Sequence, residues 1–133
     1  MQISGSKWLV TGGASGMGRH FTLQLAREGA DVAFCDMNEE GIQALVAEGA
    51  ALPGKVLGFT CNVADSAAVN KLITDVAEAL GGLNGIVNNA GIIRDGLLVK
   101  KDRKTGELKA LSDQKWQQVI DVNLTGVFNG ARA

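Results

Sequence analysis

A glycine-rich segment between an apolar run and an amphipathic run constrains the fold of this chain most strongly. The apolar run Trp8-Leu9-Val10 leads into Thr11–Gly18, and an amphipathic stretch follows from Met17 to Gly29. This order predicts a strand, a tight turn and the start of a helix. The glycines within it have the spacing G-x-x-x-G-x-G. Such a turn can place bare backbone N–H groups and a helix N-terminus against a pair of phosphates.

Apolar runs alternate with helical patterns through the first 90 residues. We expect strands over 7–11, 31–36, 56–61 and 85–89, and helices over 17–29, 39–49 and 66–80, the last capped by Ser66. A helix between successive strands requires a crossover connection, so the strands are predicted to be parallel. The result is a doubly wound α/β sheet of the Rossmann type with strand order 3-2-1-4. Its ligand crevice lies at the carboxyl ends of strands 1 and 4.

The composition fits one partial dinucleotide-binding domain over residues 1–133. Hydrophobic residues make up 46% of the chain and the net charge is −1, so we expect neither a nucleic-acid nor a membrane partner. The N-terminus lacks an apolar signal core, and we predict a cytoplasmic protein. Cys35 and Cys61 each lie near the end of an apolar run and are predicted to be buried free thiols. His20 is the only histidine, so no metal site is predicted.

Residues 92–113 break the alternation and carry a charged surface insertion near 99–111. Two interpretations are open: a charged hairpin around the Thr105-Gly106 turn, or a solvated loop, which is favoured. A last helix should begin near Ser112 or Asp113 and follow strand 4 at the end of the chain. Its expected buried stripe consists of Trp116, Val119, Ile120, Leu124, Val127, Phe128 and Ala131. Asn123 falls within this stripe, where its amide needs hydrogen-bond partners.

Polar residues follow the predicted strands at the edge where a ligand would bind. Asp36 ends the second strand 18 residues after Gly18, where a carboxylate can accept hydrogen bonds from a ribose diol. The same carboxylate would repel a 2′-phosphate, so NAD is favoured over NADP, with Arg19 as a weak argument against. Asn62-Val63 follows strand 3, and Asn88-Asn89-Ala90-Gly91 follows strand 4. Such residues can contact a ligand or satisfy neighbouring backbone groups.

Together these motifs resemble those of the short-chain dehydrogenase/reductases, in order and in spacing. The resemblance rests on Thr11–Gly18, Asp36, Asn62-Val63, Asn88–Gly91 and Val122-Asn123-Leu124-Thr125-Gly126. Gly91–Leu98 and Trp116–Phe128 are most similar to the bacterial 3-oxoacyl-carrier-protein reductase type. That type usually uses NADP(H), whereas Asp36 favours NAD(H).

The resemblance implies a role for each matching position. Gly12, Ser15, Gly16, Met17 and Gly18 would surround the pyrophosphate and the adjoining ribose. Asp36 would hold the adenosine ribose, and Met37, Asn62 and Val63 would border the adenine. Asn89, Ala90 and Gly91 would line the path to the nicotinamide ribose. Asn123 would be the asparagine of the catalytic tetrad.

The resemblance also implies that catalysis needs residues outside the matching motifs. In this family a tyrosine, a lysine four residues later and a serine follow the tetrad asparagine, and this chain contains no tyrosine. We therefore expect the NAD(H)-binding half of an oxidoreductase for an alcohol/ketone pair, a small-molecule substrate. Its expected partners are a C-terminal fragment of the same enzyme, further copies of this chain, or both. The alternative is a non-catalytic dinucleotide-binding module or a truncated, self-associating fragment.

Overall fold

In the computed structural model, which describes residues 2–133, the four apolar runs form one parallel sheet. The strands are β1 (Lys7–Thr11), β2 (Asp31–Asp36), β3 (Val56–Thr60) and β4 (Gly85–Val87). Their order is β3-β2-β1-β4, which confirms the predicted topology. In the register, Thr11 is paired with Cys35, and Asp36 with Thr60. The carboxyl ends of β1, β2 and β3 therefore lie together at one edge of the sheet.

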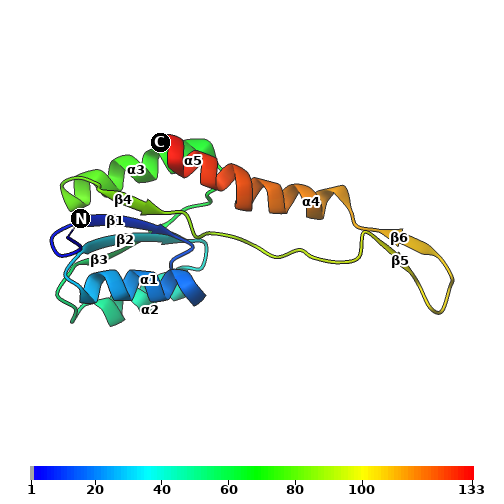
Figure 1. The fold of residues 1–133 in the computed structure, drawn as a ribbon, viewed down its shortest axis with the longest axis horizontal. Coiled ribbons are helices and arrows are strands. Elements are labelled where there is room, and N and C mark those ends of the chain that lie inside the picture. Colours follow the sequence, from blue (N-terminus) through cyan, green and yellow to red (C-terminus); the bar gives the residue numbers. More distant parts are fainter. Residues whose placement is uncertain (1) are drawn as a thin grey trace.

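Helices cover both faces of this sheet (Figure 1). The helices α1 (Gly16–Arg27) and α2 (Glu39–Gly49) lie on one face, and α3 (Ser66–Leu80) and α5 (Gly126–Arg132) on the other. Alternate residues of β2 enter the two cores: Phe34 packs on the α1 and α2 side, and Cys35 on the α3 side. Burial on both faces explains why the strands are continuous apolar runs rather than alternating ones.

Side chains cap three of the helices, and one of these caps corrects a prediction. Asn38 accepts a hydrogen bond from the Gly41 N–H, and Ser112 accepts one from the Lys115 N–H. For α3 the cap is Asp65, whose Oδ1 accepts from the N–H groups of Ala67 and Ala68 at 2.9 and 3.1 Å. The prediction that Ser66 caps this helix was wrong. The Asp65 carboxylate bonds to two of the first free N–H groups, so Ser66 is the first helical residue.

The last helical segment differs most from expectation. It consists of α4 (Asp113–Ile120), a π-helical turn η1 (Asp121–Thr125) and α5. The predicted buried stripe is wrong in this structure: Trp116 is 58% exposed, Leu124 63% and Phe128 56%. This helical segment instead contacts the rest of the domain, here called the body, at two glycines that allow close approach. Gly126 lies against Val63, and Gly130 lies against Ile86 and Asn88.

The charged insertion forms the hairpin that was one of its two interpretations. The strands β5 (Val99–Lys101) and β6 (Leu108–Ala110) are antiparallel and fully exposed, and they project away from the sheet (Figure 1). Lys100 lies directly opposite Lys109. Asp102 offsets this repulsion, because its carboxylate lies 3.5 Å from Lys109 Nζ and accepts from the Lys104 N–H at 2.8 Å.

Candidate functional site

The glycine turn after β1 brings backbone segments closer together than side chains would allow. Gly12 has a φ of +64°, and a Cβ at this position would lie 2.8 Å from the Cα of Ala90. A Cβ on Gly18 would lie 2.0 Å from the carbonyl oxygen of Gly12. Real Cβ atoms do not come this near, so both positions require glycine. The turn therefore packs directly against the end of β4 and against the first turn of α1.

The N-terminus of α1 faces this turn without a cap. Ser15 takes the N-cap position, but its side chain makes no capping hydrogen bond, and the first turn holds no acidic residue. The side-chain caps of α2, α3 and α4 make this end different from theirs. Uncapped N–H groups and the positive end of the helix dipole attract an anion such as a phosphate.

Asp36 at the end of β2 joins the strand to the glycine turn. Its Oδ2 accepts a hydrogen bond from the Ala14 N–H at 3.0 Å. Its Oδ1 accepts from the N–H groups of Met37 at 2.8 Å and Asn38 at 3.1 Å. A carboxylate has about four acceptor positions, so one remains for a ligand hydroxyl.

On the other side of the turn, Thr11 and Asn89 hold the end of β4 against β1. The Thr11 hydroxyl oxygen accepts from the N–H groups of Asn89 and Ala90, both at 3.0 Å. The Asn89 side-chain Nδ2 donates to the carbonyl oxygens of Thr11 and Gly12, at 3.0 and 3.1 Å. The strand β4 ends at Val87, so Asn88 and Asn89 lie outside the strand predicted over 85–89, and Asn89 bonds to the glycine turn instead.

A pocket of about 390 Å³ lies among these groups, within the size range of small-molecule sites, about 300–1,000 Å³. Every predicted cofactor-binding residue lines it except Gly18, which packs beneath the turn. The lining consists of Gly12, Ser15, Gly16, Met17, Asp36, Met37, Cys61, Asn62, Val63, Asn89, Ala90, Gly91, Ile92 and Val122. That these residues bind a cofactor stays a prediction.

Sequence reasoning missed three of the lining residues. Cys61, Ile92 and Val122 are apolar, and each directly precedes or follows a predicted site residue. Their position next to Asn62, Gly91 and Asn123 was the available signal. Cys61 is also the neighbour of Cys35; this neighbour and burial raise the pKa of the Cys35 thiol well above its ordinary value. Cys35 and Cys61 are both buried and free, as predicted.

Asn123, the predicted catalytic asparagine, lies in the π-helical turn and does not line the pocket. Its side chain instead bonds twice to the backbone of Ile92. The Ile92 N–H donates to Asn123 Oδ1 at 2.8 Å, and Asn123 Nδ2 donates to the Ile92 carbonyl at 3.0 Å. Asn123 is exposed rather than part of a buried stripe, and it fixes the segment that borders the pocket after Gly91.

Among residues 2–133, no three side chains of the metal-binding types come together. Within the same range, each helix is too short or too polar to cross a membrane.

Comparison with protein families decides the identity of this arrangement. The family model for short chain dehydrogenases matches residues 7–133, which is almost the whole chain. The chain belongs to the short-chain dehydrogenase family. The glycine turn, Asp36 and the Asn123–Ile92 contact are thus parts of a short-chain dehydrogenase fold, although the match assigns no ligand to any of them.

Individual relatives share the family with this chain but differ in substrate. The 3-oxoacyl-acyl-carrier-protein reductase FabG of Thermotoga maritima is 40% identical over 129 residues, covering 97% of this chain and 48% of the relative. The 2,5-dichloro-2,5-cyclohexadiene-1,4-diol dehydrogenase of Sphingobium indicum is 38% identical over 126 residues, covering 95% and 46%. The chain therefore spans about half the length of the curated relatives that it matches.

Solved structures support the fold independently. A short-chain dehydrogenase/reductase from Burkholderia phymatum, solved in complex with NAD, superposes with a TM-score of 0.82 at 27% identity. The alignment covers 99% of this chain and 43% of that one. A short-chain dehydrogenase from Mycobacterium smegmatis gives the same TM-score at 30% identity, covering 98% and 51%.

Proposed function

We propose that this chain is the NAD(H)-binding half of an oxidoreductase that interconverts an alcohol and a ketone. The observation that carries the proposal is the position of Asp36, which lines the pocket beside the uncapped start of α1. A carboxylate and a set of free N–H groups on one pocket wall complement a ribose diol next to a pyrophosphate. The NAD complex of the Burkholderia relative supports the choice of ligand.

The charges around Asp36 favour NAD over NADP. The carboxylate would repel a 2′-phosphate on the adenosine ribose, and a cation beside it would be needed to reverse this. The candidate considered from the sequence is Arg19, which directly follows the last glycine of the turn, but its guanidinium pairs with the Glu48 carboxylate on α2. The Thermotoga relative does not decide between the two cofactors, because its name specifies the substrate alone.

The residues of the chain divide the binding task between them. Gly12 and Gly16 leave the backbone of the turn open to the ligand, and a Cβ on Gly16 would point into open space. Asn89 holds the turn to β4, and Ala90 and Gly91 extend the pocket along the end of that strand. When bound, the nicotinamide of the cofactor supplies or accepts the hydride. No side chain of the chain is required to carry electrons.

Catalysis in this proposal needs a C-terminal half. The chain has no tyrosine to act as the acid/base group on the substrate oxygen, and it spans about half of its relatives. Asn123 then serves as a positioning residue, because it holds Ile92 at the pocket through two hydrogen bonds. The substrate is proposed only as an alcohol/ketone pair, since the relatives act on chemically different molecules.

Calorimetric titration of the chain with NADH and with NADPH tests the proposal. We expect NADH to bind at least about tenfold more tightly, and Asp36→Ala to remove most of this difference. Asp31→Ala is the matched control. Asp31 lies at the opposite end of the same strand and accepts from the Lys55 N–H at 2.9 Å, far from the pocket. Equal affinity for both cofactors in the unchanged chain would contradict the NAD assignment, and no binding of either would contradict the proposed function.

A further inference from the structure

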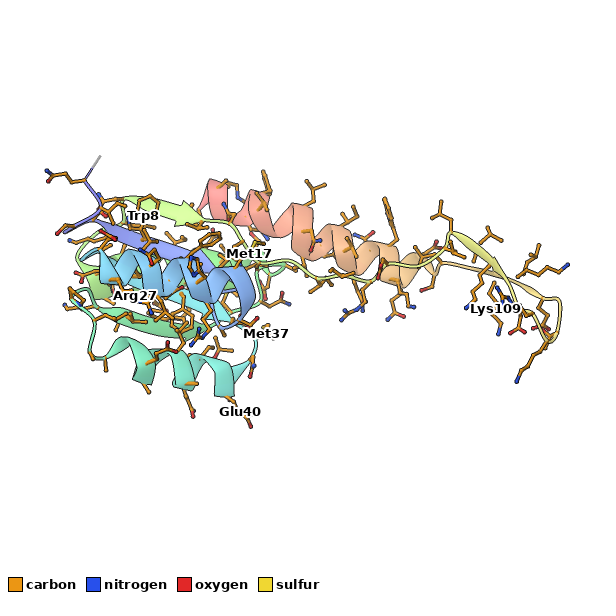
Figure 2. The ribbon with its side chains drawn as sticks, turned by 60° about the horizontal axis from the view of Figure 1, so that its bottom comes forward. Trp8, Met17, Arg27, Met37, Glu40 and Lys109 are labelled. Carbon is orange, nitrogen blue, oxygen red and sulfur yellow. The ribbon has the colours of Figure 1, made fainter. Side chains whose placement is uncertain are left out.

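Sulfur-containing side chains gather at the candidate pocket. Met17, Met37 and Cys61 all line it. The two methionines are among the most exposed large apolar residues of the body, at 71% for Met17 and 64% for Met37. Figure 2 shows both at the same end of the body, one at the start of α1 and the other after β2.

Neither methionine has a structural task in the cores. The two hydrophobic clusters that hold the sheet to its helices include neither of them. Their backbones are nevertheless fixed. Met17 lies in the first turn of α1, and the Met37 N–H donates to Asp36 Oδ1 at 2.8 Å. Two thioethers are therefore held at the pocket with most of their surface free to contact a ligand or a small reagent.

An exposed thioether is open to a specific reaction. A hydroperoxide transfers one oxygen atom to the sulfur: an S–O bond forms, the O–O bond breaks, the sulfur is oxidised by two electrons, and hydrogen peroxide leaves as water. The reaction requires no thiolate, so it depends on exposure rather than on a neighbouring base. Cys35 is fully buried and Cys61, although it lines the pocket, is only 7% exposed, so the two methionines are the more accessible sulfurs at this pocket.

We propose that Met17 and Met37 are oxidation sites through which a hydroperoxide weakens dinucleotide binding at this pocket, reversibly by methionine sulfoxide reductases. The inference rests on the proposed NAD(H) site and adds a means of regulating it.

Two effects of the sulfoxide lower the affinity. Met37 follows Asp36 directly, so its thioether offers apolar contact to the base next to the ribose that Asp36 would hold. A polar sulfoxide replaces that contact with a group that prefers water. Met17 lies beside the uncapped N–H groups of α1, and its sulfoxide oxygen would compete with the phosphates for these donors.

The test compares NADH binding before and after treatment with hydrogen peroxide. Catalase removes the peroxide, and dithiothreitol then reverses oxidation of the thiols to sulfenic acid or disulfide without reducing sulfoxides. Peptide mass spectrometry measures oxygen addition at Met17 and Met37, circular dichroism checks the fold, and fluorescence titration gives the Kd. We expect Kd to rise about five- to tenfold and to return after treatment with methionine sulfoxide reductases.

The double variant Met17→Leu/Met37→Leu separates the methionines from other targets. Whatever its starting affinity, its Kd should be the same before and after peroxide. Saturating NAD⁺ should also slow oxidation of both methionines in the unchanged chain. An unchanged Kd in a chain oxidised at both positions overturns the inference, as does an equal loss of affinity in the double variant. Failure of the untreated chain to bind NADH would instead contradict the proposed function.

Discussion

Asp36 Oδ2 lies 3.0 Å from the backbone nitrogen of Ala14 and accepts its hydrogen bond, which ties the end of β2 to the glycine turn. The carboxylate proposed to hold the ribose therefore also sets the shape of the loop proposed to hold the phosphates. A change at this residue alters both at once. In the proposed function, cofactor selectivity and turn geometry therefore depend on the same side chain.

Replacing Asp36 with asparagine should loosen the turn even without ligand. The amide keeps one acceptor oxygen but cannot serve all three N–H groups that the carboxylate serves. We expect the Ala14 amide to exchange with solvent roughly tenfold faster, because about 1.5 kcal/mol of a charge-assisted hydrogen bond is lost. Hydrogen exchange followed by NMR measures this. The Ala67 amide, which Asp65 holds, is the control and should not change.

A methyl group on Gly18 should destabilise the fold. The new Cβ would meet the Gly12 carbonyl oxygen at 2.0 Å and Asn89 Nδ2 at 2.5 Å, and backbone cannot move aside as a side chain does. Gly18→Ala should cost about 2 kcal/mol, or roughly 5–10 °C in Tm, by thermal melting. At Gly96 the nearest atom to a new Cβ is Leu111 Cδ1 at 3.6 Å, so Gly96→Ala should melt within about 2 °C of the unchanged chain. Equal effects of the two changes would disprove the close approach.

Much of the fold follows from the sequence because the strands are buried on both faces. The apolar runs of β1 and β2 have no polar alternation, and helical patterns separate them, so parallel strands were predictable before any contact was known.

Periodicity was a poor guide to the last helix. Its apolar spacing predicted a buried face at Trp116 and Leu124, yet the helix contacts the body through Gly126 and Gly130. Spacing identifies a helix but does not specify what packs against it.

The pocket was partly predictable because polar residues directly follow the buried strands. Residues such as Asp36 and Asn62 could be named because polar groups after buried strands must find partners at the sheet edge. The contact of Asn123 with Ile92 joins segments 31 residues apart, and no local pattern indicates which backbone groups an amide will bind. The cap of α3 was also beyond local sequence patterns. Asp65 and Ser66 are both good capping residues, and only the structure shows that Asp65 caps the helix.

The Asn123–Ile92 pair should contribute to stability in a way that a conservative change reveals. Asn123→Ala removes both hydrogen bonds to Ile92 and should lower the free energy of unfolding by about 1–2 kcal/mol. Asn123→Asp keeps the acceptor for the Ile92 N–H but places a carboxylate oxygen against the Ile92 carbonyl oxygen in place of the donor, so it should be at least as destabilising as Asn123→Ala. Chemical denaturation of the three chains gives the order. An Asn123→Asp chain as stable as the unchanged chain would show that the donor bond to the Ile92 carbonyl contributes nothing.

The hairpin should lose structure in acid because of Asp102. The backbone N–H groups of Lys104 and Thr105, followed by Lys109, hold the pKa of this carboxyl below its ordinary value. A folded-state pKa below the unfolded one stabilises the hairpin above about pH 4. That stabilisation disappears as the pH falls through the folded-state value. NMR shifts of the Lys104 and Thr105 amides should report this loss, and Asp102→Asn should make them insensitive to pH in that range.

An amide footprint of NADH would show whether the pocket at the carboxyl ends of the strands binds a dinucleotide. In two-dimensional NMR of the chain, saturating NADH should shift the amides of Gly12, Ser15, Gly16, Met17 and Met37. The amides of the β5–β6 hairpin, which projects away from the sheet (Figure 1), should stay in place. Shifts confined to the hairpin, or none at all at millimolar NADH, would show that this pocket is not a dinucleotide site.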